Sequence, residues 1–305
     1  MKGRVVLAGG SGFIGRALAS GLLKGGYEVV VLTRAPRERD DGVREVEWDG
    51  EHIGEWIQFL DGAKALVNLT GRSVNCRHTP EHLREIRESR VNSVRVLTVA
   101  LDHAKQPPQV WVQAGAVGFY GNRGEWLCDE NAPVGDGALA DICRQWEDVF
   151  HSIKARQTRR VLLRIGFVLG RDGGALPVLA KLTRRFLGGA AGNGRQYISW
   201  IHLADLTRMF IEAIERDDRA GTFNATAPAP VTNAEFMRVL RRIVYRPWSP
   251  PVPAWAVRVG SRLMQTEPSL ALDGCRCVPD RFLEGGFQFQ FAELRPALKE
   301  IYRGG

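Results

Sequence analysis

The sequence has few lysines, few cysteines and no long hydrophobic run. Only seven of its 42 basic residues are lysines, and its five cysteines stand at irregular spacings. An odd number of cysteines without a regular framework is typical of a protein in a reducing cytosol. A spanning helix needs about 20 consecutive apolar residues, and no stretch approaches that length. We therefore expect a cytoplasmic protein with no signal peptide, no membrane segment and no membrane partner.

The sequence also lacks the spacings of a metal site and of a nucleic-acid-binding module. Cys275 and Cys277 are the only close pair of cysteines, and no second cluster of cysteine or histidine accompanies them, so we expect no metal. The net charge of +8 favours anionic partners. However, the densest basic stretches, 156–164 and 238–246, carry apolar residues at strand and helix spacings. We interpret them as solvated faces of buried elements and expect no nucleic acid partner.

What the sequence does have is a strand, a glycine-rich turn and a helix at its start. Residues 5–8 are a short apolar run, typical of a strand buried in a parallel sheet. Four residues of the turn, Gly-Gly-Ser-Gly, follow at once, and from Ile14 apolar side chains recur at helical spacing until the glycines at 25 and 26. A second apolar run over residues 29–32 completes a βαβ unit.

The alternation of strands and helices continues along the chain. Further strands are expected over 65–69, 110–114, 161–169 and 222–225, and further helices over 80–104, 138–154, 203–215 and 234–244, the last capped by Thr232 or Asn233. This alternation predicts an α/β fold with a Rossmann-type, doubly wound parallel sheet. We assign residues 1–230 to a nucleotide-binding domain and residues 231–305 to a smaller C-terminal lobe, to which the glycine-rich segment 171–201 contributes.

The turn between the first strand and the first helix has the spacing of a phosphate-binding loop. Gly9, Gly12 and Gly15 fit G-x-x-G-x-x-G, and counting from Gly10 gives G-x-G-x-x-G. Glycines in this context permit the tight turn, bring backbone amides to a pyrophosphate and let the helix pack closely on the strand. We predict a dinucleotide site that includes Gly9, Ser11, Gly12, Phe13, Ile14 and Gly15.

The end of the second strand selects the form of the dinucleotide. A carboxylate there would bind the ribose 2′-hydroxyl of NAD, whereas an arginine would attract the 2′-phosphate of NADP. Arg34 follows Thr33, and no acidic residue occurs before Glu38. We therefore predict NADP as the cofactor, with Thr33 and Arg34 beside the adenosine phosphate.

Several further motifs, in the order in which they occur, resemble one family. They are Asn68-Leu69-Thr70-Gly71, Gly118-Phe119-Tyr120-Gly121, the segment 164–170 and the run Trp-Ile-His-Leu-Ala-Asp-Leu at 200–206. Together with the glycine loop they are similar to atypical extended short-chain dehydrogenases/reductases, and more narrowly to the NAD-dependent epimerase/dehydratase-like "epimerase family" proteins with a distinctive C-terminal domain. The resemblance spans nearly the whole chain. It implies an NADP-binding core with Leu69, Thr70, Gly71 and Arg90 near the cofactor and Val168 beside its nicotinamide half.

The catalytic residues that the resemblance implies are missing. Superfamily oxidoreductases use a serine and a tyrosine, with a lysine four residues after the tyrosine that lowers its pKa. None of the five tyrosines here is followed by lysine at that spacing. With Glu147 as the anchor, the tyrosine and lysine positions hold Leu139 and Cys143, and no serine occurs between Ser93 and Ser152. The catalytic residues are therefore unknown.

Tyr120, Cys143 and His202 are conceivable replacements, but none has an evident activating partner. We interpret them as a packed phenol, a small buried thiol and a side chain that satisfies a backbone carbonyl. Residues 192–200 form either a substrate rim or a surface loop without a ligand. Two functions stay open: an NADP-dependent oxidoreductase or epimerase on an unknown small substrate, and a non-catalytic NADP-binding sensor or interaction module. The sequence indicates neither the substrate nor the oligomeric state.

Overall fold

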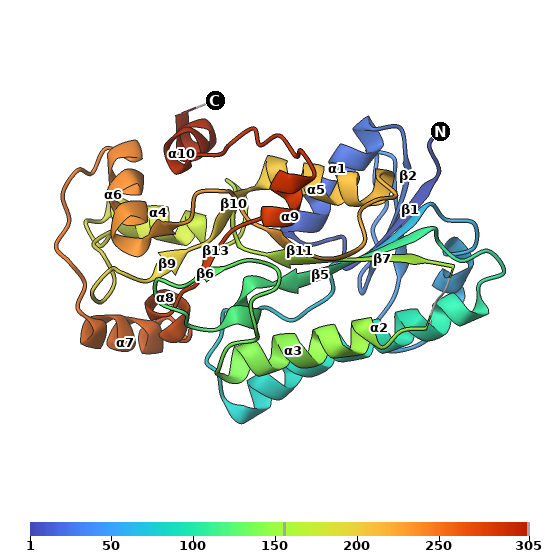
Figure 1. The fold of residues 1–305 in the computed structure, drawn as a ribbon, viewed down its shortest axis with the longest axis horizontal. Helices are drawn as coiled ribbons and strands as arrows, with labels where there is room; N and C mark the ends of the chain where they lie inside the picture. The colour runs from blue at the N-terminus through green and yellow to red at the C-terminus, as the bar shows by residue number, and fades with distance from the viewer. Residues whose placement is uncertain (155–156, 304–305) are drawn as a thin grey trace.

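The computed structural model, which describes residues 1–154 and 157–303, is built around one parallel sheet. Seven strands pair in the order β11-β7-β5-β4-β1-β2-β3 (Figure 1). They are β1 Arg4–Ala8, β2 Glu28–Thr33, β3 Val43–Glu47, β4 Ala65–Asn68, β5 Val110–Ala116, β7 Arg159–Ile165 and β11 Gly221–Ala225. Every pairing is parallel, and the strand order runs outward in opposite directions from β1 and β4. The doubly wound α/β fold is confirmed, with its switch point between β1 and β4.

Helices cover both faces of this sheet. On one face α2 (Pro80–His103) packs beside α3 (Ala138–His151), and on the other α1 (Phe13–Lys24) packs beside α5 (Leu203–Glu215) (Figure 1). The start of α2 is set by Pro80 at its first turn and by Thr79, whose Oγ1 accepts a hydrogen bond from His82 N at 3.2 Å. Cover on both faces explains why β1, β2 and β4 are apolar and buried almost throughout.

Three helices form a second apolar core beside the carboxyl ends of the strands. These are α4 (Leu176–Arg184), α6 (Asn233–Ile243) and α10 (Leu294–Arg303), which enclose Trp200, Phe236, Leu240 and Leu298 among other buried side chains. Thr232 caps α6, its Oγ1 accepting from Glu235 N at 3.3 Å. The shorter elements are η1 Glu55–Phe59, η2 Val117–Tyr120, β6 Leu127–Cys128, β8 Phe167–Leu169, β9 Tyr197–Ile198, β10 Trp200–His202, β12 Val231–Thr232, α7 Ala254–Leu263, α8 Ser269–Leu272, β13 Arg276–Cys277 and α9 Asp280–Glu284.

Two details of the predicted strands were wrong. The single strand expected over 161–169 is interrupted at Gly166, where a side chain could not fit because a Cβ would stand 2.3 Å from the carbonyl oxygen of Ser199. After this residue β8 leaves the main sheet and pairs with β10. Strand β3 was not expected at all, since it lies at the edge of the sheet and only Val43 in it is buried.

The division into two domains at residue 230 stays a prediction. The C-terminal segment contributes to both cores, because Leu294 and Leu298 lie in the second core while Phe282 and Phe287 pack in the core of the main sheet. The helices in the described ranges include none that is both long enough and apolar enough to cross a membrane.

Candidate cofactor site

The glycine loop lies at the switch point of the sheet, between the end of β1 and the start of α1. Gly9 has a φ of 74°, and a Cβ there would stand 3.0 Å from the backbone of Thr70. A Cβ on Gly15 would stand 2.3 Å from the carbonyl oxygen of Gly10. Both positions therefore require glycine. Gly9 lets the loop lie close to the residues after β4, and Gly15 lets α1 pack closely against the loop.

The N-terminus of α1 is open to an anion. Its N-cap residue is Gly12, which offers no side-chain cap, and the first turn contains no acidic residue. A Cβ on Gly12 would meet no atom nearer than 3.8 Å, so the space in front of the helix is free at this point. Unsatisfied backbone amides and the positive end of the helix dipole suit a phosphate group here.

Thr33 and Arg34 stand beside this helix N-terminus. The Thr33 Oγ1 donates to Ser11 Oγ at 3.2 Å and so connects the end of β2 with the glycine loop. Arg39, further along, pairs with Asp41 and Glu45. Arg34 is exposed and has no such acidic partner in residues 1–154 and 157–303. A second anionic group, one strand away from the first, would find a free guanidinium there.

The residues after β4 complete the same edge. Asn68 is fully buried, donates to Ser93 Oγ and Gln113 Oε1, and accepts a hydrogen bond from Thr70 N at 3.0 Å. These bonds fix the course of Leu69, Thr70 and Gly71 beside the glycine loop. The Thr70 Oγ1 atom is buried and has no partner in the described chain, which suits a polar ligand at this position.

Arg90 comes to the site from α2. Its Nη1 donates to the carbonyls of Arg72 and Ile86 at 3.0 and 2.9 Å, and its guanidinium lies 5.2 Å from the ring of Trp146. A Cβ on Gly71 would stand 3.1 Å from Arg90 Cζ. Burial lowers the pKa of Arg90, and no carboxylate of the described residues pairs with it. A partly buried cation that pairs with no carboxylate suits an anionic ligand beside it.

Phe13 connects the loop to the segment that follows β8. Its ring would contact a Cβ on Gly170, Gly173 or Gly174, all within 3.4 Å, so these glycines let the chain pass over the start of α1. Val168 lies in β8, paired with Ile201 of β10, and packs against the main core, as Ile14 does. The structure thus brings the predicted residues of the loop, β2, β4, α2 and β8 to one edge of the sheet.

No acid or base of the usual kind stands at Leu139 and Cys143, the positions at which the resemblance places the tyrosine and the lysine. Cys143 on α3 is buried, which raises the pKa of its thiol to about 12, and a Cβ on Gly118 would stand 3.7 Å from its Sγ. Leu139 lies one turn before it. At the end of β5, Gln113 is buried and hydrogen-bonded to Asn68. The interpretation of Cys143 as a packed thiol agrees with this geometry.

A buried ion pair supports the structure beneath these positions. Arg164 Nη2 lies 2.7 Å from Glu147 Oε2, with the two side chains only 7% and 4% exposed. Arg164 Nη1 also donates to the Tyr120 hydroxyl at 2.8 Å, and that hydroxyl donates to Asn224 Oδ1 at 2.8 Å. Burial raises the pKa of Tyr120, so it is a packed phenol, as predicted. Sequence reasoning missed the ion pair, although an arginine within an apolar strand was a signal for it.

His202 was expected to satisfy a backbone carbonyl, and this prediction was wrong. His202 caps α5 and its Nδ1 accepts a hydrogen bond from Ala204 N at 3.2 Å, instead of donating to a backbone carbonyl. Its Nε2 lies 3.1 Å from Glu300 on α10. Of the candidate rim over 192–200, Gln196, Ser199 and Trp200 are buried and hydrogen-bonded to backbone, so a substrate role for that segment stays a prediction.

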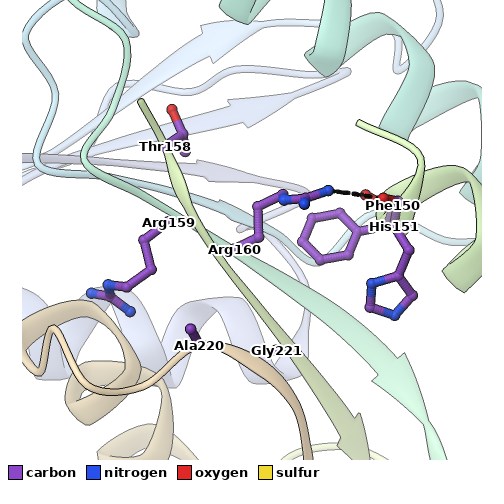
Figure 2. A pocket seen from close by; sticks show the side chains of 7 residues that line it. All are labelled: Phe150, His151, Thr158, Arg159, Arg160, Ala220 and Gly221. Carbon is purple, nitrogen blue, oxygen red and sulfur yellow. Dashed lines mark hydrogen bonds between the residues drawn. The ribbon is translucent and has the colours of Figure 1, made fainter. Parts of the chain in front are cut away.

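A pocket at the opposite edge of the sheet does not take part in this site. It has a volume of about 350 Å³ and is lined by Phe150, His151, Thr158, Arg159, Arg160, Ala220 and Gly221 (Figure 2). Its two arginines are already used, because Arg160 donates to carbonyls at the end of α3 and Arg159 to carbonyls at the end of α5. Across residues 1–154 and 157–303, no group of His, Cys, Asp or Glu side chains is placed to hold a metal ion.

Comparisons with known proteins agree with this arrangement. Residues 5–226 match the NAD dependent epimerase/dehydratase family, and residues 252–301 match a domain of unknown function, DUF1731. The human epimerase family protein SDR39U1 is 34% identical over 302 residues, covering 98% of this chain and 99% of the relative. A chloroplastic SDR39U1 homolog from Arabidopsis thaliana is 36% identical, covering 97% of this chain and 86% of the relative. The predicted cytoplasmic location therefore stays a prediction.

Solved structures give the same result. The crystal structure of human SDR39U1 (isoform 2) with NADPH superposes with a TM-score of 0.89 at 33% identity, covering 99% of this chain and 100% of that one. A nucleoside-diphosphate sugar epimerase from Corynebacterium glutamicum gives a TM-score of 0.79 at 31% identity, covering 98% of this chain and 58% of that one. The chain belongs to the NAD-dependent epimerase/dehydratase family and, within it, is similar to SDR39U1 along nearly its whole length.

Proposed function

We propose that this protein binds NADP at the switch point of its sheet and acts as an oxidoreductase or epimerase on a small substrate. One observation carries the proposal: an uncapped helix N-terminus at Gly12 lies next to an exposed arginine, Arg34, that has no acidic partner among the described residues. These two features suit the pyrophosphate and the 2′-phosphate of one dinucleotide. The human SDR39U1 crystal structure is a structure with NADPH, which supports the choice of NADP.

Each predicted site residue has a place in this proposal. Gly9, Ser11, Gly12, Phe13, Ile14 and Gly15 would hold the pyrophosphate, Thr33 and Arg34 the 2′-phosphate, and Leu69, Thr70 and Gly71 would pass the adenosine side. The Thr70 hydroxyl, which has no partner among the described residues, and the Arg90 guanidinium, which pairs with no described carboxylate, support a polar ligand near them. Val168 would lie beside the nicotinamide half. When bound, the cofactor would donate a hydride as NADPH or accept one as NADP⁺, and the chain would supply position and charge.

A second candidate function is binding without turnover. It is favoured by Leu139 and Cys143, which occupy the positions of the usual tyrosine and lysine and cannot move a proton at neutral pH. In this alternative the protein is an NADP-dependent sensor or interaction module. In the first alternative, the proton must be carried by the substrate itself, by water or by a side chain of the second lobe.

We also propose that the substrate lies between the sheet and the second lobe, which residues 171–201 and 231–305 would form. The carboxyl edge of the strands is where ligands bind in open α/β sheets, and α4, α6 and α10 stand beside that edge (Figure 1). Nucleotide sugars are the first substrates to test, because a relative at 31% identity is named as a nucleoside-diphosphate sugar epimerase.

Titration calorimetry with NADPH, NADP⁺, NADH and NAD⁺ tests the binding. We expect the phosphorylated forms to bind at least about tenfold more tightly, a difference of about 1.4 kcal/mol. An absence of heat and of any thermal-melt shift with all four would reject the proposal.

Turnover separates the two candidate functions. The protein would be incubated with NADPH and ketones or aldehydes, and with NADP⁺ and nucleotide sugars, and both NADPH absorbance and the isomers of each sugar would be followed. Consumption of NADPH or a new sugar isomer identifies an enzyme. Tight binding without either result identifies a binding module.

A further inference from the structure

Three of the five cysteines lie together in a small buried core outside the candidate cofactor site. Cys128 is on β6, Cys277 is directly opposite it on β13, and Cys275 comes two residues earlier. These three cysteines are between 0% and 6% exposed. The sulfur atoms of Cys275 and Cys277 are 3.2 Å apart, which is closer than non-bonded sulfur atoms normally approach.

Ser199 fixes the two thiols in this position. Its Oγ donates to the carbonyl of Cys275 at 2.7 Å and accepts from the amide of Cys277 at 2.8 Å, so one side chain spans the backbone on both sides of Arg276. Residues two apart in an extended chain face the same side. Arg276 faces the other way, with its guanidinium 5.2 Å from the ring of Tyr197. The backbone therefore holds the two sulfurs toward each other and leaves the arginine outside.

The cover over the thiols is thin. The β6–β13 ladder consists of only two residue pairs; Leu127 within it and Trp126 just before it are 54% and 70% exposed. A ladder this short can open locally at much lower cost than the strands of the main sheet. Opening it would expose Cys275 and Cys277 to small molecules without unfolding the nucleotide-binding core.

We propose that Cys275 and Cys277 are a site of reversible oxidation, at which a low-molecular-weight disulfide such as glutathione disulfide converts the two thiols into one intramolecular disulfide. The Cys275 sulfur, as thiolate, attacks one sulfur of glutathione disulfide, breaks its S–S bond and releases one glutathione. The Cys277 sulfur then attacks Cys275, forms the new S–S bond and releases the second glutathione. Two electrons pass to the oxidant, and the two thiol protons end on the two glutathiones.

Oxidation of Cys275 would change a contact at the end of β5, on the side of the sheet where we place the substrate. In the reduced protein the Cys275 thiol lies 3.5 Å from the carbonyl oxygen of Val117, which directly follows the end of β5, where the family's catalytic serine is expected. The disulfide would remove the thiol hydrogen from this contact. Because reducing compartments keep most disulfides open, such a bond would form only under oxidising conditions, as in redox-sensing proteins.

Thiol counting on the intact, reduced protein tests the proposal. The protein would be equilibrated in buffers of increasing glutathione disulfide to glutathione ratio, alkylated and weighed by mass spectrometry. We expect the number of alkylated thiols to fall from five to three without a bound glutathione. Trypsin cleaves after Arg276, so the disulfide would appear as a linked pair of peptides, 263–276 and 277–281, that a reductant separates.

Serine variants identify the pair. Cys275→Ser and Cys277→Ser should each keep all remaining thiols alkylatable or carry a single glutathione, whereas Cys76→Ser, a cysteine outside the cluster, should form the linked peptides as the parent does. Circular dichroism establishes that each variant is folded, and Cys275→Ala provides a second substitution if the serine variant is not. Five free thiols at the most oxidising ratio, or linked peptides that contain Cys128 or Cys76, would overturn the assignment.

Discussion

The adenosine side and the nicotinamide side of the candidate cofactor site are built from different parts of the chain. On the adenosine side, Gly9, Gly12 and Gly15 present backbone amides, and Arg34 adds one exposed charge. On the nicotinamide side, Leu139 and Cys143 stand where the resemblance places the catalytic tyrosine and lysine, and a buried ion pair lies beneath them. The proposed binding through backbone amides and any side-chain chemistry therefore depend on separate residues, so each can be tested by its own variants.

The largest effect is expected on the free energy of unfolding, when the buried ion pair beneath the nicotinamide side is broken. Glu147→Gln leaves Arg164 buried without a counter-charge and should lower the free energy of unfolding by about 3–5 kcal/mol, measured by urea denaturation. Arg144→Met on the same helix removes an exposed pair with Asp141 and should cost less than about 1 kcal/mol. Equal losses for the two variants would mean that the buried pair does not support this side.

On the adenosine side, Gly15→Ala should strongly weaken binding of the pyrophosphate. The new Cβ would stand 2.3 Å from the Gly10 carbonyl oxygen, so the loop must shift, and NADPH affinity should fall at least about 100-fold, or about 2.7 kcal/mol. Gly260→Ala in α7 meets no atom within 4 Å and serves as the matched control. Calorimetry on both folded variants gives the comparison, and an unchanged affinity in Gly15→Ala would refute backbone binding at this loop.

Arg34→Glu separates the two forms of the dinucleotide. Reversal of the charge should weaken NADPH about 30-fold, which corresponds to about 2 kcal/mol, because the new carboxylate repels a 2′-phosphate and can accept a ribose hydroxyl instead. NADH affinity should change by less than about threefold. Arg37→Glu, another exposed arginine nearby, controls for the general charge. A parallel loss of NADPH and NADH affinity would contradict the 2′-phosphate assignment.

Arg90→Met gives the smallest effect and tests where the two sides meet. Arg90 lies against Gly71, which we assign to the adenosine side, and also near Cys143, where the resemblance places the lysine; the prediction is that it acts on the nicotinamide side. Its loss should weaken NADPH about tenfold, or about 1.4 kcal/mol, and leave 2′,5′-ADP, which lacks nicotinamide, unchanged. Arg87→Met on the same helix is the control. If both ligands weaken together, Arg90 belongs to the adenosine side or to the scaffold.

The sequence predicted the parts of the molecule that depend on local pattern. The βαβ unit around the glycine loop and the cap of α6 by Thr232 follow from spacing within a few residues, and α5 was predicted with its observed bounds, Leu203–Glu215. The break at Gly166 and the pairing of Arg164 with Glu147 depend on residues far apart in the sequence. Strand β3 lacks an apolar pattern because it has one neighbour and an exposed edge. Apart from the position of Arg164 within an apolar strand, no local signal could reveal these features.

The placement of Phe282 and Phe287 in the core of the main sheet means that part of the C-terminal segment belongs to the same packed body as the strands. Phe282 stacks 5.1 Å from Phe223 of β11, and Arg219 Nη2 donates to the Gly285 carbonyl at 3.0 Å. A fragment cut after residue 230 would lose this cover and present β11 to water. A chimera that takes its C-terminal lobe from a relative must therefore keep α9 or supply other side chains that cover β11.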